Sequence, residues 1–166
     1  MKTSLSKYLL SGVATALLFT SGVVTATVKV DFPHPEKYTD IPSTSHGKQE
    51  MMTTLRKHFE VLGAKLPAGQ NLSIEVQDIV LAGRHDPFIF GSRMVDPDLR
   101  VIRGRTDWPR MEFKYSIGAE GKTLQSGTAK ISDMNYQMGH NKYSSNESLR
   151  YEKKMLDEWF RDVLPK

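Results

Sequence analysis

Residues 111–131, MEFKYSIGAEGKTLQSGTAKI, carry the most regular pattern in the chain. Apolar and polar side chains alternate from Met111 to Ile117, which is typical of a strand with one face on a core and the other in water. Glu120 and Gly121 then predict a hairpin turn, and residues 123–131 are expected to form the partner strand. The segment therefore predicts a β-hairpin.

Three other segments also have strand character. They are residues 27–32, residues 72–81 and residues 99–103. Pro33 ends the first of them, because proline lacks the donor that a strand ladder needs. In the second, the apolar phase slips at Asp78, which indicates a bulge or a twist. Residues 84–98 between the last two are expected to form a long irregular loop.

Two helices are predicted from apolar side chains at helical spacing. The first is expected to begin near residues 43–45, with hydroxyl groups available to cap it. Its apolar face consists of Met52, Leu55, Phe59 and Leu62. The second is expected to begin near residues 145–148, with its charged side chains in solvent. Its apolar face consists of Leu149, Leu156, Phe160 and Val163 with Trp159 beside them, and its solvated charges include Glu152 and Asp157.

These elements occur in the order β-α-β-β-β-β-α. Strands in sequence followed by a helix predict an α+β fold of two layers. We expect an approximately five-stranded sheet, mostly antiparallel or mixed, with two main helices. Residues 27–166 are long enough for one such domain.

Residues 1–26 have the pattern of a bacterial signal peptide. Lys2 and Lys7 give a positive start, no acidic residue precedes Asp31, and residues 8–24 are mostly apolar. Val24-Thr25-Ala26 fits the small-x-small rule, so cleavage is expected after Ala26. The alternative is a retained membrane anchor, but serine, threonine and glycine interrupt the apolar run. We therefore expect a periplasmic protein of a Gram-negative bacterium, with no membrane span after cleavage.

The composition excludes several classes of function. The chain contains no cysteine, which rules out disulfides, thiol catalysis, thiolate metal sites and a lipid anchor on an N-terminal cysteine. Its formal charge is +4, and the leader contributes two lysines and no acid, which leaves +2 for the mature part. This charge is too small to indicate nucleic acid as a partner.

Several short motifs, taken together in their order and spacing, resemble a known family. They are residues 35–40 (PEKYTD), 66–70 (LPAGQ), 78–83 (DIVLAG), 108–110 (WPR), 133–136 (DMNY) and 149–153 (LRYEK) with Trp159 and Phe160. The chain resembles the proteobacterial envelope proteins that share the domain of unknown function numbered 3016. The resemblance covers residues 28–164 and implies an exported single-domain protein. It implies no reaction, ligand or catalytic residue.

Arginine is concentrated between residues 84 and 110. Because guanidinium groups bind phosphate and carboxylate through paired hydrogen bonds, this segment predicts an anion-recognition surface. The residues of this candidate ligand site are Arg84, Arg93, Arg100, Arg103, Arg105, Trp108 and Arg110. The alternative is a solvated surface on which the arginines pair with the nearby Asp86, Asp96, Asp98 and Asp107.

Residues 133–143, with two methionines and two tyrosines, are either a loop pinned to the core or a contact surface.

The sequence gives little sign of catalysis or of a metal site. The five histidines form no close metal-binding spacing, although His85 and Asp86 could join a distant histidine. No serine lies in a G-x-S-x-G motif. We therefore expect no catalytic residue, no metal and no cofactor, and an enzyme is the less favoured reading.

Three functions remain open from the sequence. The leading one is non-catalytic binding of an anionic envelope component or a periplasmic protein. The alternatives are a small hydrolase-like periplasmic enzyme with a site in the loops, and a structural subunit of an envelope complex. A binder should expose a basic or aromatic patch, and an enzyme should have a concave pocket with converging polar groups. A subunit should expose a broad apolar patch or a free sheet edge.

Overall fold

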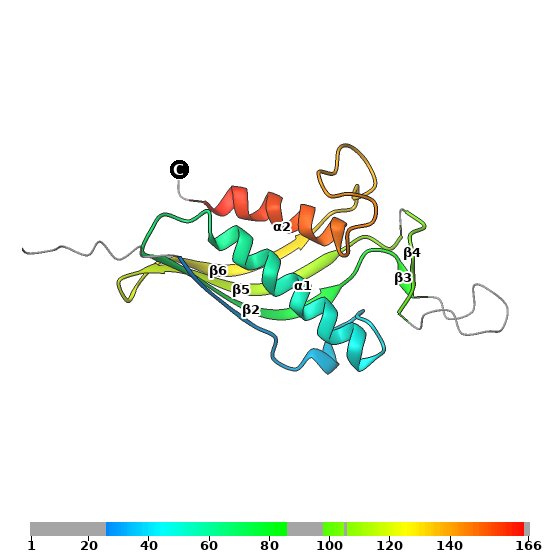
Figure 1. The fold of residues 1–166 in the computed structure, drawn as a ribbon, viewed down its shortest axis with the longest axis horizontal. Coiled ribbons are helices and arrows are strands. Elements are labelled where there is room, and N and C mark those ends of the chain that lie inside the picture. The colour runs from blue at the N-terminus through cyan, green and yellow to red at the C-terminus, as the bar shows by residue number, and fades with distance from the viewer. Residues whose placement is uncertain (1–25, 86–97, 105, 165–166) are drawn as a thin grey trace, which may run out of the picture.

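Four strands form one mixed sheet in the computed structural model, which describes residues 26–85, 98–104 and 106–164. Across the sheet they run in the order β1 (Thr27–Asp31), β2 (Gln70–Val80), β5 (Arg110–Ala119) and β6 (Lys122–Ser132). β1 is parallel to β2, whereas the β2–β5 and β5–β6 pairs are antiparallel. The helices α1 (Ser45–Gly63) and α2 (Arg150–Val163) form the second layer (Figure 1). The predicted two-layer α+β fold is confirmed.

The fifth expected strand belongs to a separate ribbon. β4 (Arg100–Val101) pairs antiparallel with β3 (Arg84–His85), beyond one end of the main sheet (Figure 1). Gly83 turns the chain away from β2 with φ of 77°, a conformation that glycine adopts without strain. The N–H of Gly83 donates to the carbonyl oxygen of Asp107 at 2.9 Å, which fixes this departure.

The first helix begins where the hydroxyl groups predicted it. Thr44 is the N-cap of α1, and its hydroxyl oxygen accepts a hydrogen bond from Gly47 N at 2.9 Å. Leu55, Phe59 and Leu62 are buried as expected. Met51 is the buried methionine, whereas Met52 is only partly covered.

The second helix begins later than expected. α2 starts at Arg150, and its N-cap Leu149 is left-handed with φ of 55° and gives no side-chain cap. Trp159 and Phe160 belong to the core as predicted, with 7% and 1% of their surface exposed. The Trp159 ring packs edge-on against Phe113 of β5, with 4.7 Å between ring centroids. A short 3-10 turn, η1 (Pro35–Lys37), precedes α1.

The sheet buries one face and leaves the other in water. On the helix side, Leu72, Ile74 and Val76 of β2 lie in the core. On the opposite side, ion pairs join Lys114 to Glu75 at 3.1 Å and Lys130 to Glu112 at 3.0 Å, and no helix among the described residues covers them. The alternation of apolar and polar residues in the segment 111–131 therefore reflects these two faces, one packed against the helices and one exposed to water.

Two local expectations about the strands are confirmed. The β2–β5 register shifts between Val76 and Asp78, where the apolar phase slips. Glu120 and Gly121 form the β5–β6 turn, with φ of 51° and 76°. In the described part of the chain, no helix has the length and apolar character that a membrane crossing requires.

The segment between β6 and α2 is a loop, as expected. Tyr136 is 2% exposed and pins this loop to the body of the protein. Its ring packs edge-on against Tyr151 of α2, with 4.8 Å between centroids. Met134 and Met138, by contrast, are 64% and 70% exposed. The buried tyrosine agrees with a loop pinned to the core, and a contact surface at the exposed methionines stays a prediction.

Candidate functional site

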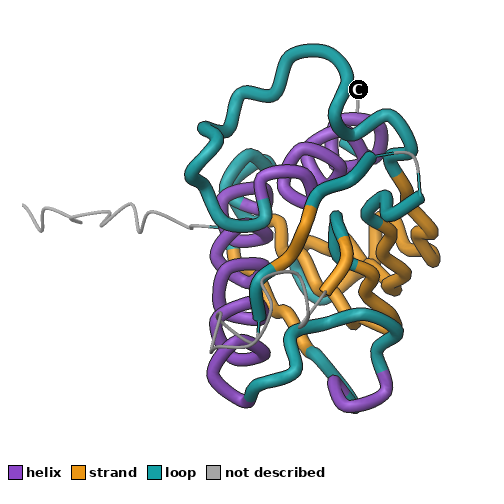
Figure 2. The backbone as a smooth tube through the Cα atoms, turned by 90° about the vertical axis from the view of Figure 1, so that its right-hand side faces the viewer, coloured by secondary structure: helices purple, strands orange, loops and turns teal. Residues whose placement is uncertain are grey.

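Both helices begin at the end of the molecule that carries β3 and β4. Figure 2 shows the molecule from this end, where loops and the short ribbon surround the end of the main sheet. Two hollows open here. We call them the arginine hollow, lined by Arg84 and Arg110, and the Glu152 cavity, lined by Glu152 and Arg150.

Arg100 lies between the two hollows and is already bound within the protein. Its guanidinium donates two hydrogen bonds to the Asp40 carboxylate, at 3.0 and 2.6 Å. It also donates to the carbonyl oxygens of Leu81, Ala82 and Gly83. This predicted ligand-binding arginine therefore clamps β4 to the end of β2, and its charge partner comes from a distant segment.

The other arginines of the predicted site are placed differently. Arg84, Arg103 and Arg110 are exposed, and Trp108 is half-buried. The Arg110 guanidinium lies 5.2 Å from the centroid of the Trp108 ring, within the range of a cation–π contact. Arg93 and Arg105 lie outside the described residues.

The arginine hollow has a volume of about 230 Å³. Arg84 comes from β3 and Arg110 from the start of β5, so the fold brings together two arginines that are distant in sequence. Asp40 and Asp107 also line it, but the Asp40 carboxylate is held by Arg100. The hollow therefore combines two exposed guanidinium groups with one other acidic residue.

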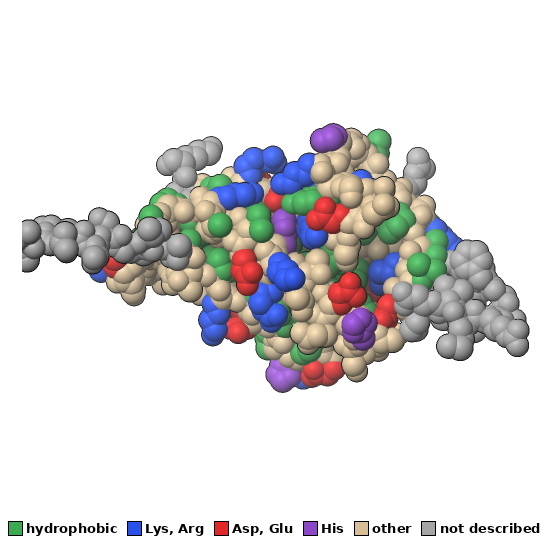
Figure 3. All heavy atoms as spheres, in the orientation of Figure 1, with side chains coloured by type: hydrophobic (Ala, Val, Ile, Leu, Met, Phe, Trp, Pro, Cys, Tyr) green, Lys and Arg blue, Asp and Glu red, His purple; other side chains and the backbone are tan. Residues whose placement is uncertain are grey.

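The Glu152 cavity is larger, at about 380 Å³, and lies between the first turns of α1 and α2. Its apolar lining includes Met51, Leu81, Leu99, Ile102 and Leu149. Leu99 and Ile102 are 39% and 38% exposed. Figure 3 shows apolar side chains on the surface at this end of the molecule.

Glu152 was expected among the solvated charges of the last helix, and this expectation is wrong. The side chain is 2% exposed, and its Oε1 accepts a hydrogen bond from Ala82 N at 2.6 Å. Burial raises the pKa of the Glu152 carboxyl, although main-chain hydrogen bonds and the charge of Arg100 oppose that rise. Helical spacing did not reveal this, because the second helix begins at Arg150 and its first turn faces the end of β2.

Asp98 holds the loop that leads into α1. Its carboxylate accepts hydrogen bonds from Ser43 N at 2.8 Å, from Thr44 N at 3.2 Å and from the Thr44 hydroxyl. Partial burial alone would raise the pKa of Asp98, but these hydrogen bonds lower it. A Cβ atom on Gly47 would lie 2.2 Å from an Asp98 oxygen, so glycine permits this close approach.

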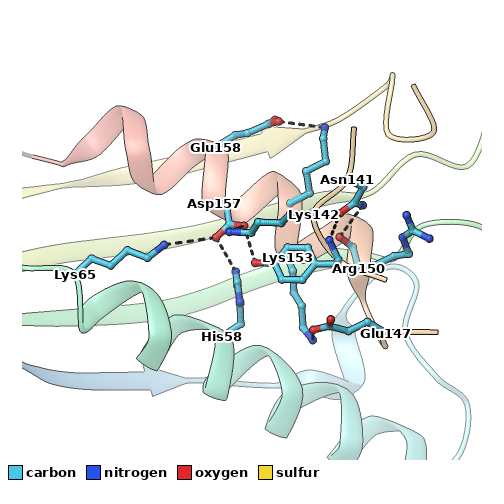
Figure 4. A network of polar contacts seen from close by, with 11 residues as sticks. His58, Lys65, Asn141, Lys142, Glu147, Arg150, Lys153, Asp157 and Glu158 are labelled. Carbon is cyan, nitrogen blue, oxygen red and sulfur yellow. Dashed lines mark hydrogen bonds and ion pairs between the residues drawn. The ribbon is translucent and has the colours of Figure 1, made fainter. Parts of the chain in front are cut away.

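A second polar cluster lies between the helices, away from both hollows. Figure 4 shows His58 of α1, Asp157 of α2 and Lys142 of the loop that precedes α2 pointing toward one another. Asp157 accepts a hydrogen bond from the Tyr143 hydroxyl at 2.6 Å and pairs with Lys142 at 2.7 Å. His58 Nε2 lies 3.5 Å from Asp157 Oδ1. Asp157, like Glu152, was expected in solvent and is largely buried instead.

The titration of this cluster follows from burial and charge. Burial lowers the pKa of His58 to about 4, although Asp157 opposes this change. Burial alone would raise the pKa of Asp157, but Lys142 and Tyr143 lower it. At neutral pH the cluster therefore holds a neutral imidazole and an ionised carboxylate whose partners come from the protein.

No metal centre is evident in the described ranges. There, no group of three or more histidine, aspartate or glutamate side chains is placed to hold an ion. His34, His46 and His140 are exposed and apart from His58. The suggested pair of His85 with Asp86 cannot be placed, because Asp86 and the side chain of His85 lie outside the described residues.

The fold and its hollows define a small two-layer α+β protein with surface depressions at one end of its sheet. The chain matches the family described as a protein of unknown function (DUF3016) over residues 26–162, and it belongs to that family. The resemblance found in the sequence motifs is thereby confirmed. Comparison with curated proteins gave no match, and comparison with solved structures gave none either.

Proposed function

We propose that the protein is a non-catalytic binding protein of the bacterial periplasm that recognises an anionic component of the envelope. The observation that carries this proposal is the convergence of Arg84 and Arg110 on one hollow beside Trp108. Exposed guanidinium groups bind phosphate and carboxylate through paired, planar hydrogen bonds. The ligand would therefore present phosphate or carboxylate groups to the arginine hollow.

The proposed location rests on residues 1–26. Their positive start, apolar run and small-x-small end at Ala26 have the form of an export signal. In the envelope, phosphate groups of phospholipids and of lipopolysaccharide would be the most abundant anionic surfaces. Two exposed arginines beside an aromatic ring suit such a surface better than they suit a buried small molecule.

The residues around the hollows favour binding over catalysis. If the protein were an enzyme, Glu152 would be the strongest candidate for a general acid or base, because it is buried and lines a cavity. The described lining of this cavity also contains Ser145, Ser148 and Tyr151, but no histidine or lysine that could act as a basic catalytic partner of Glu152. A carboxyl group without such a partner suits the recognition of a ligand better than proton transfer.

Sedimentation with lipid vesicles tests the proposal. The protein, purified as the host processes it, should sediment with vesicles that contain phosphatidylglycerol or lipopolysaccharide, and not with vesicles of phosphatidylcholine. The Arg84→Glu/Arg110→Glu variant should bind the anionic vesicles at least about tenfold more weakly, since two charge-assisted contacts are lost.

Lys122→Glu/Arg161→Glu is the matched control, because both side chains are exposed, at the β5–β6 turn and in the last turn of α2. This variant makes the same change in charge per residue outside the arginine hollow, and it should retain most of the binding. Equal losses in the two variants would indicate a diffuse charge effect and would contradict a specific site.

A further inference from the structure

The Glu152 cavity has two properties that the arginine hollow does not share. It is lined by apolar side chains from α1, from the residue after β4 and from the N-cap of α2, namely Met51, Ile102 and Leu149. It also contains a guanidinium group that has no acidic partner among the described residues, although it lies over the Tyr151 ring with 5.1 Å to the ring centroid. Its volume of about 380 Å³ lies within the range of small-molecule sites, about 300 to 1,000 Å³.

Arg150 is that guanidinium group. Of the two arginines that line the cavity, Arg100 is bound to Asp40, whereas Arg150 has no carboxylate within ion-pair distance in the described part of the chain. Its Nε is buried without a hydrogen-bond partner among these residues. Figure 4 shows the Arg150 side chain extending away from the Asp157 cluster. A buried, unpaired donor is costly unless a ligand or water completes it.

The acidic residues of the cavity are largely neutralised or engaged. Asp98 accepts hydrogen bonds from Ser43 and Thr44, and Glu147 pairs with Lys153 at 2.8 Å. Burial favours the neutral form of Glu152, which does not repel an anion and can donate a hydrogen bond. Glu50, the remaining acid, is exposed on α1.

We propose that the Glu152 cavity binds an amphiphile with one apolar chain and an acidic head group. The chain would lie against Met51, Leu99 and Ile102, and the head group would meet Arg150 beside Glu152. The apolar walls account for the chain, and the unpaired guanidinium accounts for the charge of the head group. This site uses neither Arg84 nor Arg110, so it is separate from the proposed envelope-binding surface.

Isothermal titration calorimetry with defined amphiphiles tests this proposal. Laurate and dodecyl phosphate, used below their micelle concentrations, should both bind. Whichever has the higher affinity shows whether the cavity prefers a carboxylate or a phosphate head group. Dodecanol has the same chain without charge and should bind at least about tenfold more weakly, because a charge-assisted contact is missing. Affinity for carboxylates should rise about fourfold per added methylene until the cavity is full.

The Arg150→Gln variant should lose the preference for laurate over dodecanol. Arg161→Gln, the matched control on the same helix, should keep it. Leu99→Gln makes the apolar wall polar without adding charge, and it should weaken laurate and dodecanol together. Circular dichroism should show the same folded spectrum for each variant.

Three results would overturn the proposal. They are the absence of laurate binding, equal binding of laurate and dodecyltrimethylammonium, and an unchanged laurate affinity in Arg150→Gln. The Arg84→Glu/Arg110→Glu variant should still bind laurate. Failure of the vesicle experiment and failure of the calorimetric experiment are therefore distinguishable.

Discussion

The protein has two polar clusters that use buried charge in opposite ways. In the cluster between the helices, Asp157 is surrounded by His58, Lys142 and Tyr143, so its partners come from the protein itself. At the β3–β4 end, Glu152 has a main-chain donor on one oxygen, and Arg150 has no acidic partner in the described residues. The first arrangement joins two helices and a loop through Lys142 and Tyr143, although His58 Nε2 and Asp157 Oδ1 have no hydrogen-bond partner among the described residues. The second leaves the Arg150 guanidinium without an acidic partner beside an apolar cavity. Burial of charge alone therefore does not identify a functional site, because the partners decide its role.

Removal of Asp157 should have the largest effect on stability. Asp157→Ala leaves the Tyr143 hydroxyl and the Lys142 ammonium without their shared acceptor beside the buried His58. We expect a loss of about 3 kcal/mol in the free energy of unfolding, measured by urea denaturation. Asp162→Ala removes an exposed carboxylate from the same helix and should cost less than about 0.5 kcal/mol. Similar losses in the two variants would show that the cluster does not hold the helices together.

The same cluster should make the protein sensitive to acid. Because the pKa of His58 is lowered to about 4 in the folded state, the unfolded chain binds a proton first as the pH falls. The stabilisation is present above the unfolded value of 6.5 and is lost as the pH falls toward 4. Between pH 6.5 and pH 4, the free energy of unfolding of the native protein should fall by up to about 3 kcal/mol more than that of His58→Gln.

His46→Gln provides the control for this experiment, since His46 is exposed on the same helix. Its acid unfolding should follow that of the native protein. If His58→Gln and the native protein lose stability in parallel, then His58 is not kept neutral by burial.

Glu152 should show the opposite pH dependence with a smaller effect. Its pKa is raised, so its contribution to stability is complete below the unfolded value of 4.5 and is lost as the pH rises through the folded value. Glu152→Gln is neutral at every pH and keeps an acceptor for Ala82 N. As the pH rises from 4 to 8, we expect the free energy of unfolding of this variant to increase by about 1 kcal/mol relative to that of the native protein.

Thermal denaturation across this pH range measures the gain. Glu60→Gln replaces an exposed glutamate on α1 and should keep a constant difference from the native protein. A constant difference for Glu152→Gln as well would mean that the pKa of Glu152 is the same in the folded and the unfolded state, and would remove the support that its neutral form gives to anion binding.

Periodicity predicted most of the fold, because the fold buries one face of each element. The alternation from Met111 to Ile117 and the phase slip at Asp78 both report which side of the sheet faces the helices. The site was harder to predict. Arg84 and Arg110 were identified by residue type, but their convergence depends on the turn at Gly83 that places β3 beside the start of β5.

Glu152 and Arg150 could not be identified from the sequence in this way. A charged residue in the first turn of an amphipathic helix is usually solvated. Here Leu149 is left-handed and α2 begins only at Arg150. The first turn of α2 then lies against the end of β2, where Ala82 N donates to Glu152. Arg100 illustrates the reverse case, because an arginine chosen for ligand binding is held by Asp40, whose position no local pattern predicts.

The turn between β5 and β6 has a practical consequence. It lies at the opposite end of the sheet from β3 and β4 (Figure 1), and the chain contains no cysteine. Lys122 is exposed at this turn, so Lys122→Cys would introduce a unique thiol remote from both hollows. A fluorophore or a surface linker attached there would orient the molecule with both hollows accessible.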